Sequence, residues 1–169
     1  AGAEEFGLYA YAFTWMTVLA MVLPLGLNDA VLRLVPEYSS TEKWARVRGI
    51  VIASPFIVLL FGAMVAVGGI LAFRLIPPLQ SSIYANSMEI ALLTAPMLGV
   101  LVLFEGTGRA FGSVVPAFTP RTLALPLFVL LAAFLLMRLA PPLSAGEILW
   151  ATFFGALIVL LIQAVMIGI

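Results

Sequence analysis

The chain has 169 residues, of which 64% are hydrophobic and 9% charged, and its eight basic and eight acidic side chains cancel. A globule of this composition would have almost no polar surface, so a water-soluble fold is excluded and a membrane protein is indicated. The absence of Cys and His excludes disulfides and the usual metal ligands, and no basic block indicates nucleic-acid binding, so we expect no metal, no cofactor and no nucleic-acid partner.

Five apolar runs follow one another, and the charged residues are gathered between them. The runs cover residues 6–27, 49–73, 90–104, 122–137 and 148–169. A bilayer core about 30 Å thick requires roughly 20 residues of helix, and nothing in the chain shows the alternation of a membrane-spanning β-barrel. The sequence therefore predicts an all-α, polytopic membrane bundle of five transmembrane helices, forming a single domain over residues 1–169.

Basic residues are distributed unequally over the four gaps. The first and third gaps carry six, and the second and fourth carry only Arg74 and Arg138. Because loops rich in Lys and Arg stay in the cytoplasm, we expect the first and third gaps to be cytoplasmic, with residue 1 outside the cytoplasmic membrane and residue 169 inside. An external amino terminus without a signal peptide is difficult to insert, so we also expect a further helix upstream and interpret the chain as part of a longer protein.

Individual residues within the spans predict further local features. The first span begins with aromatic side chains of the kind found at membrane interfaces; these are Phe6, Tyr9, Tyr11, Phe13 and Trp15. Pro24 and Gly26 interrupt its other end, and we expect residues 28–38 to continue as helix toward the membrane surface. Gly108 and Gly112 form a small-xxx-small pair, which favours close approach of a neighbouring helix. Glu147 begins the last span, where the helix dipole favours a carboxylate.

Two acid–base pairs stand near the cytoplasmic ends of the first and third spans. Asp29 and Arg33 are four residues apart, as are Glu105 and Arg109, so each pair shares a helix face and can form an ion pair. One interpretation is that these pairs only anchor their helices at the interface, where a charge costs little. The other is that they line a cavity open to the cytoplasm that accepts a charged ligand.

Enzyme signatures are absent from the sequence. There is no nucleophile elbow, phosphate-binding loop or zinc pattern, and the Ser residues have no His partner. We therefore expect that the chain is not an enzyme.

Several ordered segments resemble a known transporter family. They are GAEEFGLYA (residues 2–10), GLNDA (26–30), RLVPEY (33–38) and GTGR (106–109), followed by Pro116, Ala117 and Arg121. This pattern is similar to the polysaccharide flippase branch of the multidrug/oligosaccharidyl-lipid/polysaccharide exporter superfamily, in which Phe is commoner at the position of Leu34. The resemblance covers the first two-thirds of the chain.

The resemblance implies that the five spans are helices 2–6 of a two-lobe transporter with 12–14 helices. Such a flippase moves lipid-linked oligosaccharide precursors across the cytoplasmic membrane by alternating access, and its partners are the bilayer, that substrate and the remaining helices. Its cavity receives a pyrophosphate, and the resemblance makes Arg33 and Arg109 the candidates for binding it. Asp29 and Glu105 would then position these two arginines or bind a coupling ion.

Two alternative functions remain open. A cation-coupled multidrug or metabolite antiporter of the same superfamily requires a buried carboxylate in mid-membrane. A non-transporting membrane scaffold predicts outward contacts through Gly108 and Gly112 and no polar cavity.

Overall fold

The computed structural model describes residues 2–113, 120–139 and 144–167, and this part of the chain is helical without strands. Five of its helical segments are long and apolar enough to span a membrane. They are α1 (Ala3–Val22), α3 (Trp44–Leu75), α5 (Ala85–Ala110), the segment formed by the π-helix η1 (Pro120–Ala124) and α7 (Leu125–Leu139), and α8 (Ala145–Ile167). Two further helices are α2 (Leu27–Ser40) and α4 (Pro77–Gln80). The prediction of an all-α bundle with five spans is confirmed, whereas residues 1 and 169, Pro116 and Ala117 lie outside the described residues.

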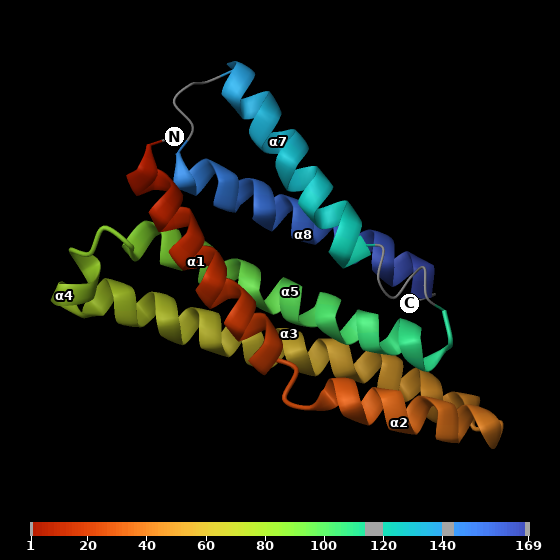
Figure 1. Ribbon diagram of the computed structural model, residues 1–169. Coiled ribbons are helices and arrows are strands. Elements are labelled where there is room, and N and C mark those ends of the chain that lie inside the picture. The colour runs from red at the N-terminus through yellow and green to blue at the C-terminus, as the bar shows by residue number, and fades with distance from the viewer. Residues whose placement is uncertain (1, 114–119, 140–143, 168–169) are drawn as a thin grey trace.

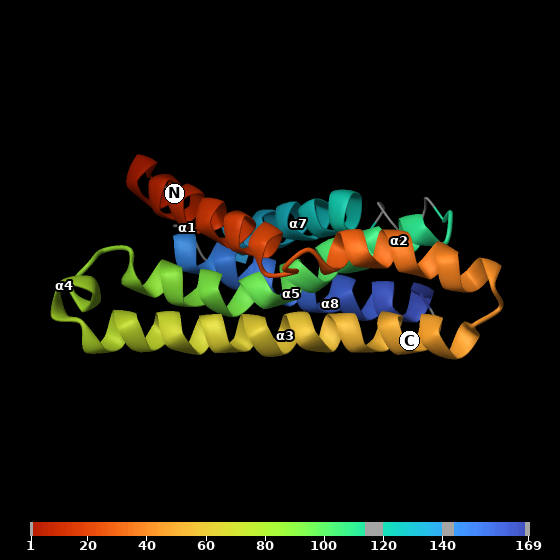
Figure 2. The ribbon, with the colours of Figure 1, turned by 90° about the horizontal axis from the view of Figure 1, so that it is seen from below.

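Helix α5 is the centre of the bundle. It packs against α1, α2, α3 and α8, and most of its residues are buried. Figures 1 and 2 show α3 running along one side of α5 while α1, α2 and α7 lie on the other. Helix α7 packs mainly against α8, so it stands at the edge of the bundle. The hydrophobic pattern of 90–104, which has no polar side, is explained by this central position.

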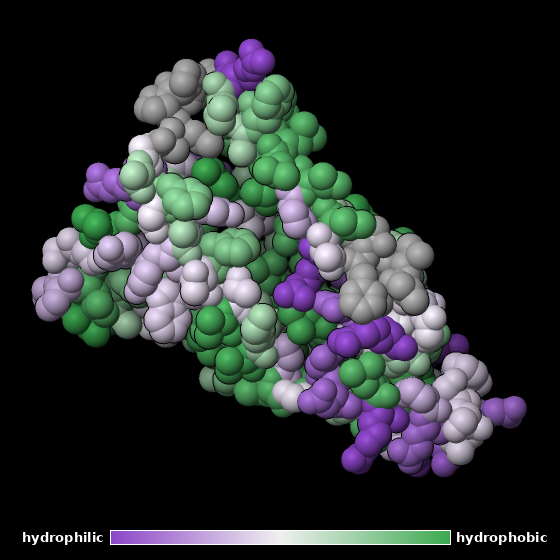
Figure 3. Space-filling view, in the orientation of Figure 1, coloured by the Kyte–Doolittle hydropathy of each residue, from purple (hydrophilic) through white to green (hydrophobic). Residues whose placement is uncertain are grey.

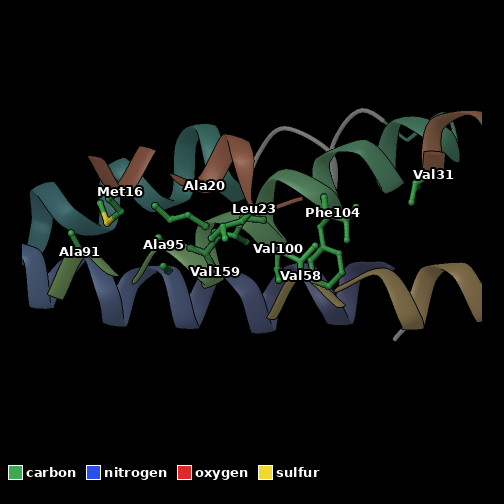
Figure 4. Close-up of a cluster of buried hydrophobic side chains, with 14 of the residues drawn as sticks. Met16, Ala20, Leu23, Val31, Val58, Ala91, Ala95, Val100, Phe104 and Val159 are labelled. Atoms are coloured by element: carbon green, nitrogen blue, oxygen red, sulfur yellow. The ribbon is translucent and has the colours of Figure 1, made fainter. Parts of the chain in front are cut away.

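The core is one continuous cluster that joins these helices through α5. Figure 4 shows Met16 and Ala20 of α1 facing Ala91 and Ala95 of α5, with Val58 of α3 near Val100 farther along. Where two helices come closest, one of them has a glycine, which has no side chain to keep the helices apart. A Cβ on Gly62 of α3 would lie 2.7 Å from the Cβ of Pro96 in α5.

Further glycines act in the same way, but Gly112, which was expected to do so, does not. A Cβ on Gly69 of α3 would lie 2.7 Å from Leu92 of α5, and one on Gly155 of α8 would lie 2.6 Å from Phe128 of α7. Gly108 is buried, and Gly112 lies beyond the end of α5 in a turn with φ of 70°. The prediction of a helix-packing motif at these two positions is therefore wrong, because the helix ends before its second glycine.

The first apolar run is broken into two helices. Helix α1 ends at Val22, and Pro24 has no N–H to donate to the carbonyl of Ala20, so the α-helical hydrogen bonding cannot continue. The next two residues, Leu25 and Gly26, have φ of 50° and 77°, and such left-handed backbone interrupts the right-handed helix. The predicted interruption at Pro24 and Gly26 and the predicted helix over residues 28–38 are confirmed, and the structure adds that α2 is a separate helix.

Polar contacts tie the helices together at the end of the bundle where α3 ends and α5 begins. The guanidinium of Arg74 in α3 donates to both carboxylate oxygens of Glu89 in α5, at 3.1 and 2.9 Å. The N–H of Ala145, at the start of α8, donates to a carboxylate oxygen of Glu5 in α1 at 2.6 Å. Glu147 accepts a hydrogen bond from the N–H of Ser144 at 2.8 Å, which confirms its predicted role at a helix start.

Candidate functional site

Helix α2 has two chemically different faces. Val31 and Val35 are fully buried against the bundle, whereas Asp29, Arg33 and Glu37 are exposed. Each set repeats every four residues, so the apolar side chains form one stripe and the charged side chains another. We call the second set the charged stripe of α2. The burial of the valines fixes the rotation of the helix and thereby presents the charged stripe outward.

A hollow of about 310 Å³ adjoins this stripe, and its lining consists of Asp29, Ala30, Arg33 and Leu34. The predicted ion pair between Asp29 and Arg33 is not formed: among the described residues the ion pairs are Arg74–Glu89 and Arg121–Glu105. The side chains of Asp29 and Arg33 are therefore both open to a ligand or to solvent. Both side chains are exposed, so water screens the attraction between them even though their four-residue spacing would allow an ion pair.

Asn28 fixes α2 against the central helix. Its Oδ1 is buried without a hydrogen-bond donor among the described residues, and it lies where a Cβ of Gly106 in α5 would be. Because glycine has no Cβ, its α-carbon can approach the amide oxygen closely enough for a weak C–H···O contact. From this contact α2 and α5 run in the same direction (Figure 2), so Arg33 and Arg109 lie toward the same end of the bundle.

Arg109 is exposed in the last turn of α5, and Glu105, one turn earlier, is largely covered. The predicted ion pair of Glu105 with Arg109 is replaced by one with Arg121, whose Nη1 lies 2.8 Å from the carboxylate. Arg121 belongs to η1, so this ion pair attaches the start of the fourth span to α5. The sequence analysis used Arg121 for the orientation of the chain and for the family resemblance, and no local spacing relates it to Glu105.

These groups gather at one end of the bundle. We call this the basic end, since it also holds Lys43, Arg46 and Arg48 at the start of α3. In Figure 3, hydrophilic side chains cover the α2 side of the molecule, whereas α7 is mostly hydrophobic. Arg46 in addition lies over the ring of Tyr38, 5.5 Å from its centroid. The four residues predicted for the site are thus all at the basic end, with three exposed and one in an ion pair.

The free faces of the other spans are aliphatic and aromatic. Helix α3 exposes Ile52, Phe56, Leu60, Met64, Val67 and Leu71. The fourth span exposes Leu123 of η1 and Leu127, Leu130, Leu131 and Phe134 of α7. Such faces suit contact with lipid, which has no polar groups to offer. The exposed side chains of α1 are mixed: Tyr11, Thr14 and Trp15 carry polar groups, whereas Val18 and Met21 are apolar.

The described residues contain no cluster of acidic side chains that could hold a metal ion. Every one of the eight carboxylates lies in the described part of the chain, and none is fully buried. Comparison of the chain with protein-family models, with curated proteins and with solved structures gives no match. Its five apolar helices make it a multi-pass membrane protein with a charged stripe and a hollow at one end.

Proposed function

We propose that the chain is part of a flippase, in which these helices form one lobe and translocate a lipid-linked oligosaccharide by alternating access. The observation that carries the proposal is the charged stripe of α2. Asp29 and Arg33 line a hollow and form no ion pair among the described residues, which supports a face that looks onto a water-filled path or another lobe.

The chemistry at the basic end suits an anionic head group. Arg33 borders the 310 Å³ hollow and has no ion-pair partner among the described residues, so its guanidinium is available to a pyrophosphate. Asp29 lines the same hollow, where it can orient the guanidinium or a bound sugar hydroxyl. In this proposal the basic end faces the cytoplasm, which is the side on which such a substrate is loaded.

The structure supports the two alternatives less well. An antiporter of the same superfamily requires a buried carboxylate within a span, and none of the eight carboxylates is fully buried. A scaffold that binds through Gly108 and Gly112 requires both residues on an exposed helix face, whereas Gly108 is buried and Gly112 follows the helix.

The proposal is tested by binding of an isoprenyl pyrophosphate to the chain in nanodiscs. We expect Arg33→Gln to weaken binding about tenfold or more, because a hydrogen bond between charged groups is lost. Arg48→Gln is the matched control, since Arg48 is an exposed arginine at the same end but outside the hollow. Equal affinities of the two variants, or no binding by the unmodified chain, would contradict the proposal.

A further inference from the structure

The junction between α1 and α2 is built so that the two helices can turn relative to one another. The N–H of Leu25 donates to the carbonyl of Val22 at 3.0 Å. The N–H of Leu27 donates to the carbonyl of Pro24 at 2.8 Å. Both turns close over three residues, and no backbone hydrogen bond in the described part of the chain joins α1 directly to α2. A rotation at Pro24 and Leu25 therefore leaves the hydrogen bonds within both helices in place.

Leu25 stores conformational strain at this junction. Its φ is 50°, in the left-handed region, where the Cβ of an L-residue crowds the following carbonyl group. Its side chain is exposed, so packing of that side chain does not offset the strain. The strain persists because the two flanking helices hold the backbone there. The backbone of Leu25 thus favours any change in the angle between α1 and α2 that returns this residue to the right-handed region.

The helices on the two sides of the junction are held unequally. Val31 and Val35 of α2 are fully buried, and the amide of Asn28 contacts α5. Of the 20 residues of α1, three are buried, and two of these are the alanines Ala12 and Ala20. Because small side chains bury little apolar area, their separation from a facing helix costs little. Helix α2 is therefore the fixed side of the junction, and α1 is the movable side.

A close contact with the central helix fixes the point about which α1 can turn. Leu23, directly after α1, is buried, and a Cβ on Gly99 of α5 would lie 3.3 Å from the Cβ of Leu23. This contact keeps the end of α1 next to the junction on α5. Toward its other end α1 leans away from α5 (Figure 2) and reaches the start of α8 (Figure 1). The helix thus resembles an arm that is attached at one end.

A carboxylate connects the far end of α1 to α8. Glu5 accepts a hydrogen bond at 2.6 Å from the N–H of Ala145, the first residue of α8. A negative charge is favoured there, because the helix dipole and the free N–H groups make the start of a helix positive. We call this contact the latch. Glu4, the neighbour of Glu5 in the sequence, is exposed and does not take part in it.

We propose that α1 is a hinged arm, which pivots at residues 23–26 and is held against α8 by the latch. Two opposing effects set its position. The contact of Glu5 with α8 keeps the arm closed, and the left-handed backbone of Leu25 favours the open position. When the arm opens, the far end of α1 leaves α8, so the bundle separates at the end opposite the basic end. The inference does not depend on the proposed function, because it involves no ligand.

The test measures distances between spin labels on introduced cysteines in the chain in nanodiscs, since the chain has no Cys of its own. The first pair is Phe6→Cys with Leu75→Cys, and the second is Met21→Cys with Leu75→Cys. All three side chains are exposed; Phe6 is near the latch, Met21 is near the pivot and Leu75 ends α3. We expect two distances for the first pair, the longer one from the open arm, and one distance for the second pair.

Substitutions at the latch and at the pivot should change the ratio of open to closed molecules in opposite directions. We expect Glu5→Gln to raise this ratio about two- to fivefold, because the charge at the start of α8 is lost. Glu4→Gln is the matched control and should leave the ratio unchanged. Leu25→Gly should lower the ratio about fivefold or more, since glycine adopts the left-handed region without a steric penalty. The double variant Glu5→Gln/Leu25→Gly should lie between the two single variants.

Opposite shifts in Glu5→Gln and Leu25→Gly would support the hinged arm. The proposal is refuted if the first label pair gives one distance that no variant changes, or if Glu4→Gln and Glu5→Gln have the same ratio. It is also refuted if both label pairs broaden equally, because α1 would then move as a whole and not about its pivot. A higher ratio in Leu25→Gly would show that Leu25 does not favour the open position, which also overturns the proposal.

Discussion

Replacing Gly62 of α3 by Ala tests whether the contact between α3 and α5 is limited by backbone packing. The added Cβ would lie 2.7 Å from the Cβ of Pro96, 3.0 Å from its Cγ and 3.1 Å from its Cα. A proline ring cannot rotate out of the way and its Cα is part of the backbone, so the two helices themselves must separate. Overpacking of this kind costs about 1–3 kcal/mol.

Gly68→Ala in the same helix is the matched control, since a Cβ there would meet nothing within 4 Å. Both substitutions remove the conformational freedom of a helical glycine, which stabilises a helix by up to about 1 kcal/mol. The difference in free energy of unfolding between the two variants therefore isolates the packing cost, and we expect Gly62→Ala to be less stable than Gly68→Ala by about 1–3 kcal/mol.

The measurement is reversible unfolding of the chain in mixed micelles, followed by helical circular dichroism as the fraction of denaturing detergent rises. Equal stability of the two variants would refute the reasoning, because it would mean that α3 and α5 are not in contact at Gly62.

Three further predictions concern the basic end. Glu105→Gln should lower the free energy of unfolding by about 1 kcal/mol, because its ion pair with Arg121 is only partly covered. The same unfolding assay checks this. A loss of stability no larger than that caused by breaking the exposed pair Arg74–Glu89 would contradict the prediction. Gly106→Ala should be less stable than the control Gly68→Ala by about 1 kcal/mol, since the amide of Asn28 must rotate away from the new methyl group; equal stability of these two variants would show that α2 does not rest on α5 there. Because the chain has no Cys, Lys43→Cys and Ser81→Cys each introduce a single thiol. An impermeant maleimide should label the first from the cytoplasmic side and the second from outside, and the reverse pattern would invert the proposed orientation.

The number and approximate position of the spans could be predicted from the sequence because lipid imposes a simple requirement on length and polarity. The helix break was only partly predictable. Pro24 and Gly26 indicate an interruption, but the left-handed backbone of Leu25 is disfavoured for that residue type, so no local propensity predicts where the chain turns. The separate helix α2 depends on the burial of Val31 and Val35 against neighbours that the sequence does not place.

The polar contacts show more clearly what the sequence alone does not predict. A spacing of four residues relates Glu105 to Arg109 along one helix, but the ion pair of Glu105 is with Arg121, sixteen residues away on another element. Similarly, Gly108 and Gly112 have a recognisable spacing, whereas Gly62 and Gly155 act as contact points only because Pro96 and Phe128 happen to lie opposite them. Local patterns identify candidate residues at the basic end, and tertiary packing decides their partners.

The length of α3 has a consequence for how the molecule stands in the bilayer. Between Arg48 and Arg74 the helix has 25 uncharged residues, which extend roughly 37 Å. A hydrocarbon layer about 30 Å thick matches this length only if the helix leans by roughly 35° or the lipid thickens around it. Because α5 lies alongside α3 and carries the other helices, the whole bundle shares that inclination.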